Sequence, residues 1–198
     1  FSLAAESLSL IDNIDRAVTS FKSDENLKSN KDLDKIIDGI EIIKKDLVSI
    51  FKKNGYNVKF VQDNEVLSRH SGIIRGLHYQ LKSPQGKLVN VVAGAITDVI
   101  VDIRKGSPDF GKSIMINLDS ATHYMVYIPE GYAHGYLVLK ENTIVQYKCT
   151  NYYDPSSEYG IKWDDEDLNI SWDISDPILS DKDKYLPKLK DQTNLPIY

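Results

Sequence analysis

The chain contains a single cysteine, Cys149, so it can form neither an internal disulfide nor a metal site built from several cysteines. No apolar run reaches the roughly 20 residues that a membrane-spanning helix needs. Lys and Arg (24) are fewer than Asp and Glu (29), and the formal net charge of −5 argues against a nucleic-acid-binding protein. The first residues lack the basic and apolar segments of a signal peptide. These absences predict a cytoplasmic protein that binds neither nucleic acid nor membranes.

Proline and tyrosine are absent from residues 1–55, whereas all seven prolines and all 12 tyrosines lie beyond them. Apolar residues recur at helical spacing within 3–21 and again within 33–51, with a polar linker between the two stretches. This pattern predicts a helical hairpin as an N-terminal extension over residues 1–55, followed by a second domain over residues 56–198. We expect the apolar stripe of the hairpin to pack on the rest of the protein or on a sister chain.

Residues 56–198 favour strands and turns. Strand-like patterns occupy residues 58–61, 87–92, 96–102 and 143–148, and Gly and Pro mark the turns between them. Many short strands without long intervening helices are typical of an antiparallel sandwich or a jelly-roll barrel.

Two of the four histidines stand out because glycines flank them in predicted strands. His78 lies in residues 75–80 (RGLHYQ), and His134 lies in residues 128–135 (IPEGYAHG). A glycine in a strand often permits close approach of a ligand or of another backbone. A lone strand histidine is more often a structural residue, so both roles stay open at this point.

The residue pattern around these histidines does not favour a metal site. Gln80 and Tyr136 stand two residues after the two histidines, where a second imidazole ligand would be expected, and Gln is a poor ligand for transition metals. The glycine-rich motifs of nucleotide-phosphate sites are also absent. We expect Cys149 to be a buried structural residue of a strand.

Acid–base chemistry without a cofactor or a metal remains. A histidine can remove a proton when its pKa lies near the working pH, provided that cations or donors stabilise the negative charge that forms. Lys87 follows His78 by nine residues across a predicted turn, so a hairpin could bring the two side chains together. A solvated lysine at the end of a strand is the alternative.

An ordered series of short strings resembles the dTDP-4-dehydrorhamnose 3,5-epimerase family, a sugar-epimerase branch of the cupins. The resemblance covers about residues 58–187. The strings that carry it are residues 60–64 (FVQDN), 75–80 (RGLHYQ), 85–89 (QGKLV), 98–108 (DVIVDIRKGSP), 110–112 (FGK), 128–135 (IPEGYAHG), 147–153 (YKCTNYY), 163–165 (WDD), 170–172 (ISW) and 179–183 (LSDKD). It implies a mainly β, cupin-type jelly-roll sandwich, here with the N-terminal helical hairpin added.

The resemblance also implies a role for each matching residue. His78 would remove the proton next to the C4 ketone of a nucleotide-diphospho-4-keto sugar, and Asp183 would orient His78 and stabilise its charge. Lys87 would hold the enolate oxygen, and Tyr147 would deliver a proton to the opposite face of the ring. The residues implied in substrate binding are Arg75, which would contact the diphosphate, Gln62, Asn64, His134 and Tyr152.

The chain departs from the family at its N-terminus. Members commonly carry a Gly-Asp-x-Arg-Gly-Phe-Phe string that reaches the nucleotide, often across a dimer interface, and residues 1–55 contain no such string. The resemblance over the rest of the chain still implies an isomerase of the dTDP-L-rhamnose pathway. The enzyme would invert C3, C5 or both without a cofactor, and it would act as a homodimer. The alternatives are an epimerase of another nucleotide-4-keto-6-deoxy sugar and a non-catalytic sugar-binding or assembly module.

Overall fold

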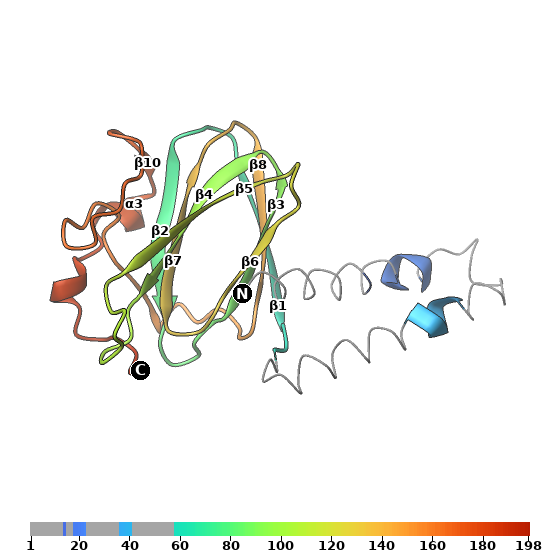
Figure 1. Cartoon of the computed structure of the whole chain (residues 1–198), viewed down its shortest axis with the longest axis horizontal. Helices are drawn as coiled ribbons and strands as arrows, with labels where there is room; N and C mark the ends of the chain where they lie inside the picture. Colours follow the sequence, from blue (N-terminus) through green and yellow to red (C-terminus); the bar gives the residue numbers. More distant parts are fainter. Residues whose placement is uncertain (1–13, 15–17, 23–35, 41–57) are drawn as a thin grey trace. The chain divides into compact units, whose positions relative to one another are not determined.

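A computed structural model of the chain describes residues 14, 18–22, 36–40 and 58–198 (Figure 1). Residues 14, 18–22 and 36–40 are helical, and the rest of the predicted hairpin lies outside the described residues, so the hairpin stays a prediction. The chain divides into one unit up to Val58 and another from Lys59 to Tyr198. The second unit contains all the strands described below.

The second unit is built mainly from β-strands, with two short helices near its C-terminus. The strands are β1 (Gln62–Ser68), β2 (Ile73–Gln80), β3 (Lys87–Ala93), β4 (Ala95–Asp102), β5 (Ser113–Asp119), β6 (Met125–Ile128), β7 (Tyr132–Val138), β8 (Thr143–Cys149), β9 (Glu158–Gly160) and β10 (Ile178–Leu179). The helices are α3 (Asp181–Lys184) and the 3₁₀-helix η1 (Leu189–Asp191).

The strands form two sheets that face each other as a sandwich (Figure 1). One sheet has the strand order β1-β8-β3-β6, and the other has the order β10-β2-β7-β4-β5, with β9 paired to β2. All pairs are antiparallel except the short parallel pair of β10 with β2. This arrangement confirms the predicted mainly β sandwich.

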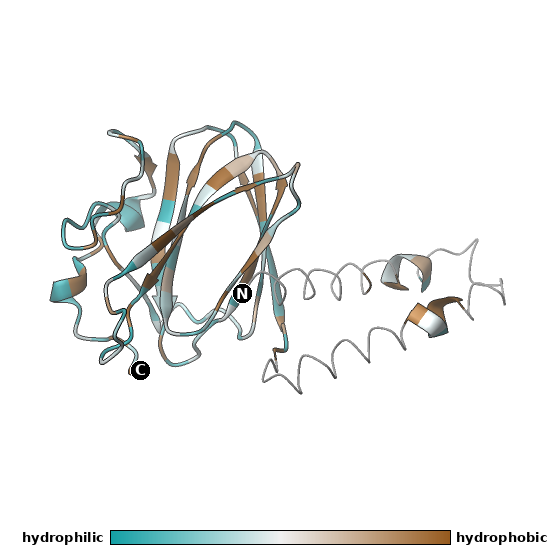
Figure 2. Cartoon of the chain, viewed as in Figure 1, coloured by the Kyte–Doolittle hydropathy of each residue, from teal (hydrophilic) through white to brown (hydrophobic). Residues whose placement is uncertain are grey.

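The six-stranded sheet is covered by apolar residues on both of its faces. An inner core lies between the two sheets; it consists of Val89, Val91, Ile96, Ile100, Leu118, Ile128, Tyr136, Val138 and Val145. An outer core lies between the six-stranded sheet and the C-terminal segment; it consists of Ile74, Leu77, Tyr79, Val99, Val101, Ile103, Ala133, Leu137, Ile161, Leu168, Trp172 and Leu189. Burial on both faces explains why five of the eight residues of β4 (AITDVIVD) are apolar, and brown segments recur along the strands of both sheets in Figure 2.

Three of the four predicted strands match the structure to within one residue at either end: β3, β4 and β8. The fourth prediction, a strand over residues 58–61, is wrong, because β1 begins at Gln62. The sequence of β1 alternates polar residues with residues of both kinds, since Gln62 and Asn64 lie on the inward side. That pattern hides the strand from an analysis based on apolar alternation.

An irregularity in β2 turns two of the predicted site residues toward the same side. Successive residues of a regular strand point to opposite faces, so Arg75 and His78, three positions apart, would be separated. The pairing of β2 with β7 shifts register between these two residues. Leu77 is fully buried in the outer core, whereas Arg75 and His78 both line a cavity between the sheets.

Glycines make this irregularity possible. Gly76 has a φ of +106°, and a Cβ atom placed on it would lie 2.6 Å from the backbone oxygen of His134. A Cβ atom on Gly135, in the facing strand, would lie 2.6 Å from the backbone oxygen of Arg75. The two backbones therefore approach closely, as the glycines flanking His78 and His134 suggested.

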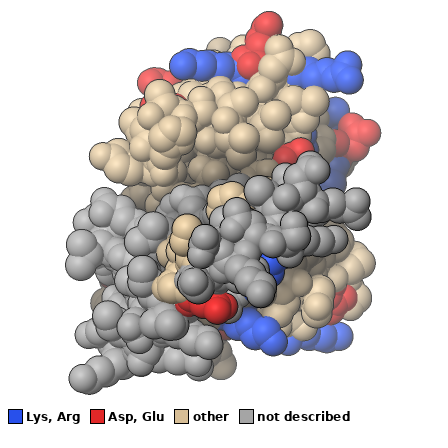
Figure 3. All heavy atoms as spheres, turned by 90° about the vertical axis from the view of Figure 1, so that its right-hand side faces the viewer, with Lys and Arg blue, Asp and Glu red and all other residues tan. Residues whose placement is uncertain are grey.

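Charged side chains of both signs are interspersed on the surface. In the face drawn in Figure 3, blue and red atoms lie close together around a broad uncharged area of the described surface. Among the described residues, no helix combines the length and the apolar character needed to cross a bilayer. The cytoplasmic location stays a prediction.

We expect Gly76→Ala to destabilise the second unit by about 2–4 kcal/mol, because the methyl group meets backbone atoms that cannot move aside and the residue has a positive φ. Gly106→Ala is the matched control: its φ is +91°, but no atom lies within 4 Å of the added Cβ. The control should lose only about 1–2 kcal/mol of backbone strain. Urea unfolding of both variants measures the difference, and equal losses would contradict the steric account.

Candidate active site

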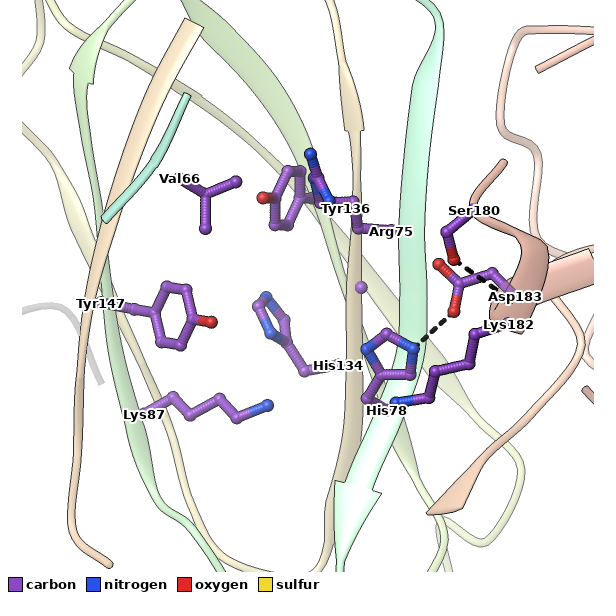
Figure 4. Close-up of a pocket in the computed structure, with 11 residues that line it drawn as sticks. Val66, Arg75, His78, Lys87, His134, Tyr136, Tyr147, Ser180, Lys182 and Asp183 are labelled. Atoms are coloured by element: carbon purple, nitrogen blue, oxygen red, sulfur yellow. Dashed lines mark hydrogen bonds and ion pairs between the residues drawn. The ribbon is translucent and has the colours of Figure 1, made fainter. Parts of the chain in front are cut away.

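A cavity of about 190 Å³ lies between the two sheets, toward the edge where α3 packs near β2 (Figure 4). Its lining combines cations, imidazoles and phenols with few apolar groups. The lining residues are Val66, Arg75, His78, Lys87, His134, Gly135, Tyr136, Tyr147, Ser180, Lys182 and Asp183.

The two sheets contribute different chemistry to this cavity. The six-stranded sheet supplies His78 from β2 and His134 from β7, and these two residues are direct register partners. The four-stranded sheet supplies Lys87 from β3 and Tyr147 from β8. In Figure 4, the side chains of Tyr147 and Lys87 point across the cavity toward the two histidines. A ligand in the cavity is therefore approached from two opposite sides.

His78 forms a close pair with a carboxylate from the C-terminal segment. Its Nε2 lies 2.6 Å from Oδ1 of Asp183, a residue of α3 that is almost fully buried. Ser180 caps α3, and its Oγ accepts a hydrogen bond of 3.1 Å from the backbone N–H of Asp183. The cap fixes the backbone that carries the carboxylate.

The environment of Asp183 keeps its carboxylate ionised. Burial alone would raise the pKa of Asp183, but the hydrogen bond and charge of His78 and the donors near Ser180 and Gly76 outweigh it, so the pKa lies below its ordinary value. With Nε2–H of His78 donating to this carboxylate, the other ring nitrogen, Nδ1, is unprotonated in the neutral imidazole. His78 is therefore oriented as a proton acceptor.

A second carboxylate stands near the free nitrogen of His78. Oε1 of Glu158, on β9, lies 4.0 Å from Nδ1 of His78. The other oxygen of Glu158 accepts a hydrogen bond of 2.7 Å from the Tyr153 hydroxyl and forms an ion pair with Lys182. Burial alone would raise the pKa of Glu158, but Lys182 and Tyr153 lower it overall. His78 thus lies between two ionised carboxylates.

His134 has a carboxylate partner of its own. Its Nε2 lies 2.7 Å from Oδ1 of Asp98, which is fully buried on β4. The second oxygen of Asp98 has no hydrogen-bond partner among the described residues. The two histidines, neighbours on the same sheet, are therefore each paired with a carboxylate: His78 with Asp183 of α3, and His134 with Asp98 of β4.

Burial tunes the two groups on the opposite sheet. Burial lowers the pKa of Lys87, an effect that the carboxylates of Glu158 and Asp98 partly offset. Burial raises the pKa of the Tyr147 phenol, so this group keeps its proton at neutral pH. Lys87 can stabilise a negative oxygen, and Tyr147 can donate a proton.

The structure brings together most of the residues singled out in the sequence. Those that line the cavity are Arg75, His78, Lys87, His134, Tyr147 and Asp183. Cys149 is buried and free, as predicted.

Three predicted substrate-binding residues lie outside the cavity lining. The carboxamide of Gln62 donates to Asn64 at 2.9 Å and accepts from the backbone N–H of Tyr153 at 2.7 Å. Asn64 is the register partner of Tyr147 on the neighbouring strand. Tyr152 is 68% exposed. Their contacts with a substrate stay predictions.

The expected hairpin between His78 and Lys87 is wrong. β2 and β3 belong to different sheets, and Lys87 approaches His78 from the facing sheet rather than from a paired strand. The predicted turn crosses from one layer of the sandwich to the other.

Sequence reasoning missed several polar residues of the site. Asp98, Glu158 and Lys182 are each separated from their histidine or carboxylate partners by 20 residues or more, and only the fold brings them together. In the sequence, flanking glycines drew attention to His78 and His134, but no comparable local pattern marked Asp98, Glu158 or Lys182. Among the residues that the structure describes, no three His, Cys, Asp or Glu side chains form a group suited to a metal ion.

Comparison with known proteins finds relatives that cover most of the chain. The model of the dTDP-4-dehydrorhamnose 3,5-epimerase family matches residues 47–191. A dTDP-4-dehydrorhamnose 3,5-epimerase from Methanothermobacter thermautotrophicus is 45% identical over 153 residues, which cover 76% of this chain and 80% of the relative.

Solved structures of similar proteins share the fold. The dTDP-6-deoxy-D-glucose-3,5-epimerase of Legionella pneumophila, in complex with dTDP-4-keto-L-rhamnose, has a TM-score of 0.71 and 42% identity, with 75% of this chain and 80% of that chain covered. A 3'-monoepimerase of Streptomyces bikiniensis, in complex with dTDP-quinovose, has a TM-score of 0.70 and 35% identity, with 76% and 78% covered.

The lowered pKa of Lys87 predicts an alkaline limit to turnover. Lys87 must be charged to stabilise a negative oxygen, so kcat/KM should fall as pH rises through a value below the ordinary 10.5 of lysine. Lys87→Arg keeps its charge at every accessible pH. The variant should be slower by roughly 10²-fold and should lose this alkaline limb. An identical alkaline limb in both proteins would contradict the assignment.

Proposed function

The chain belongs to the dTDP-4-dehydrorhamnose 3,5-epimerase family. From this premise we propose that it epimerises dTDP-4-keto-6-deoxyglucose at C3, at C5 or at both, as a step of dTDP-L-rhamnose synthesis. The observation that carries the proposal is the opposition of His78 and Tyr147 across one cavity. Inversion needs a base on one face of the sugar and an acid on the other, because a single group would return the proton to the face it came from.

The reaction begins with removal of a proton by His78. Neutral His78 takes the proton from a carbon next to the C4 ketone, and the electron pair of the broken C–H bond forms an enolate with its negative charge on O4. The Lys87 ammonium stabilises that oxygen, and the Asp183 carboxylate stabilises the new imidazolium at 2.6 Å.

The second half of the reaction sets the new configuration. Tyr147 donates its phenolic proton to the same carbon from the opposite face, and the enolate returns to the ketone. Tyr147 then regains a proton and His78 loses one, both through exchange with water. No oxidation or reduction takes place, so these side chains suffice for the chemistry proposed.

Three cations line the cavity and suit a substrate with a diphosphate: Arg75, Lys87 and Lys182. Since Lys87 is placed at the ketone oxygen, Arg75 is assigned to the diphosphate, as its planar guanidinium fits phosphate oxygens. The predicted contacts of His134, Gln62, Asn64 and Tyr152 with the substrate remain part of the proposal.

A non-catalytic sugar-binding module is the alternative of a different class. Burying the amine of Lys87 disfavours its charged form and costs stability. A module that only binds a neutral sugar has no use for that cost, or for a buried Asp183 paired to a histidine. The full set of base, partner, ammonium and phenol supports catalysis.

The proposal includes a homodimer, in which this chain meets a second copy. Two apolar residues on the outer face of the four-stranded sheet support it: Leu67 on β1 is 51% exposed, and Val92 on β3 is 45% exposed. Sedimentation of the full chain measures the oligomeric state directly.

We expect His78→Ala to reduce deuterium uptake at C3 and C5 by about 10²–10⁴-fold when the protein is incubated with dTDP-4-keto-6-deoxyglucose in deuterated water. The affinity for dTDP should change by less than about threefold, because the imidazole acts on the sugar. His70→Ala, at an exposed position, is the matched control and should exchange like the wild type. Full uptake in His78→Ala, followed by NMR, would remove His78 from the mechanism.

Tyr147→Phe should separate exchange from inversion. The base remains, so deuterium should still enter from the His78 side, whereas inverted product should fall by about 10²-fold or more. Tyr127→Phe on β6, a tyrosine outside the cavity lining, serves as control. NMR reports both quantities in one sample, and equal losses of exchange and inversion would count against Tyr147 as the opposite-face acid.

A further inference from the structure

Two buried donor groups of the cavity lining lack any hydrogen-bond partner among the described residues: Nε of Arg75 and the hydroxyl of Tyr136. Both residues line the cavity, and Tyr136 is only 4% exposed. A buried donor left unpaired costs stability, so most buried polar groups in native proteins are paired. Two such exceptions in one cavity indicate that a ligand completes them.

The pairing of β2 with β7 places these two groups next to each other. Arg75 on β2 and Tyr136 on β7 are direct register partners, so their side chains leave the same face of the sheet side by side. In Figure 4, they lie together with Val66 at one end of the cavity, whereas Lys87 and His78 lie at the other end. The unpaired groups are therefore separated from the atoms proposed to hold the ketone.

The Tyr136 hydroxyl forms no hydrogen bond with any residue that the structure describes. Asp98, its register partner on the other side, pairs through Oδ1 with His134, and no hydrogen bond joins Asp98 to Tyr136. Tyr79, a tyrosine buried to a similar degree on β2, instead donates its hydroxyl at 2.7 Å to the backbone oxygen of Asn194. This contrast indicates that the Tyr136 hydroxyl is available to donate a hydrogen bond to a bound ligand.

The chemistry of the pair selects an acceptor with negative charge. Arg75 can only donate, and burial raises the pKa of Tyr136, so the phenol keeps its proton and donates as well. Two donors, one of them cationic, suit a phosphate oxygen better than a sugar hydroxyl.

We propose that the Tyr136 hydroxyl, together with the Arg75 guanidinium, binds a phosphate oxygen of the nucleotide-sugar diphosphate. Tyr136 thereby becomes a determinant of affinity for the diphosphate. The identity of the diphosphate rests on the proposed function, but the two unpaired donors do not.

Isothermal titration of the full chain with inorganic pyrophosphate, dTDP and thymidine tests the proposal. Tyr136→Phe should weaken pyrophosphate and dTDP by the same factor, roughly tenfold or more, and leave thymidine unchanged. Removing an unpaired hydroxyl should leave the melting temperature of the ligand-free protein unchanged or higher. Tyr79→Phe, the matched control, should lower the melting temperature and leave pyrophosphate affinity unchanged.

Two results would overturn the proposal. One is an unchanged affinity for pyrophosphate and dTDP in Tyr136→Phe, including the case where only kcat/KM for the sugar substrate falls. The other is a drop in melting temperature as large as that of Tyr79→Phe, which would make the hydroxyl structural. Deuterium exchange by the wild type is recorded in parallel: its absence would refute the epimerase function and leave the phosphate contact standing.

Discussion

The distance between the two sheets is the constraint on which the site depends. Packed sheets lie about 10 Å apart, so side chains from both can reach one small ligand between them. Here the six-stranded sheet presents His78, and the four-stranded sheet presents Lys87 and Tyr147. The pairing register of the strands fixes the position of each of these side chains on its own sheet. The opposition that inversion of a stereocentre requires is therefore a property of the sandwich itself, and no moving segment has to create it.

The polar groups in the cavity lower the stability of the folded chain, and the inner and outer apolar cores offset this loss. Lys87 is half-buried and its pKa is lowered, and fully buried Asp98 has one oxygen without a hydrogen-bond partner among the described residues. Within the part of the chain that the structure describes, Nε of Arg75 and the hydroxyl of Tyr136 are likewise donors without an acceptor. Each of these features weakens the free protein, and an anionic ligand in the cavity would pair with the donors Lys87, Arg75 and Tyr136. Apolar residues cover both faces of the six-stranded sheet and hold the strands in register.

The fold and the central chemistry follow from the sequence to different degrees. β3, β4 and β8 were predictable because their apolar residues alternate or run continuously, as burial on one or two faces requires. β1 was not, because its inward residues Gln62 and Asn64 are polar. The glycines beside His78 and His134 correctly indicated a close approach of two backbones.

Pairings across long sequence separations were the part that no local pattern could reveal. Asp183 was assigned to His78 through a family resemblance, whereas Asp98, at 2.7 Å from His134, and Glu158, at 4.0 Å from His78, were missed. Lys87 was expected beside His78 for the wrong reason, since it reaches the cavity from the opposite sheet. Nor could the register shift in β2 be read from its sequence, although it alone brings Arg75 and His78 to one side.

A crystal structure of the chain with a bound dTDP-4-keto-6-deoxy sugar tests the central claim most directly. The account predicts a sugar ring between the His78 imidazole and the Tyr147 phenol, one on each face, with O4 beside the Lys87 ammonium. A ring with both groups on the same face, or a sugar bound outside the space between the two sheets, would contradict it.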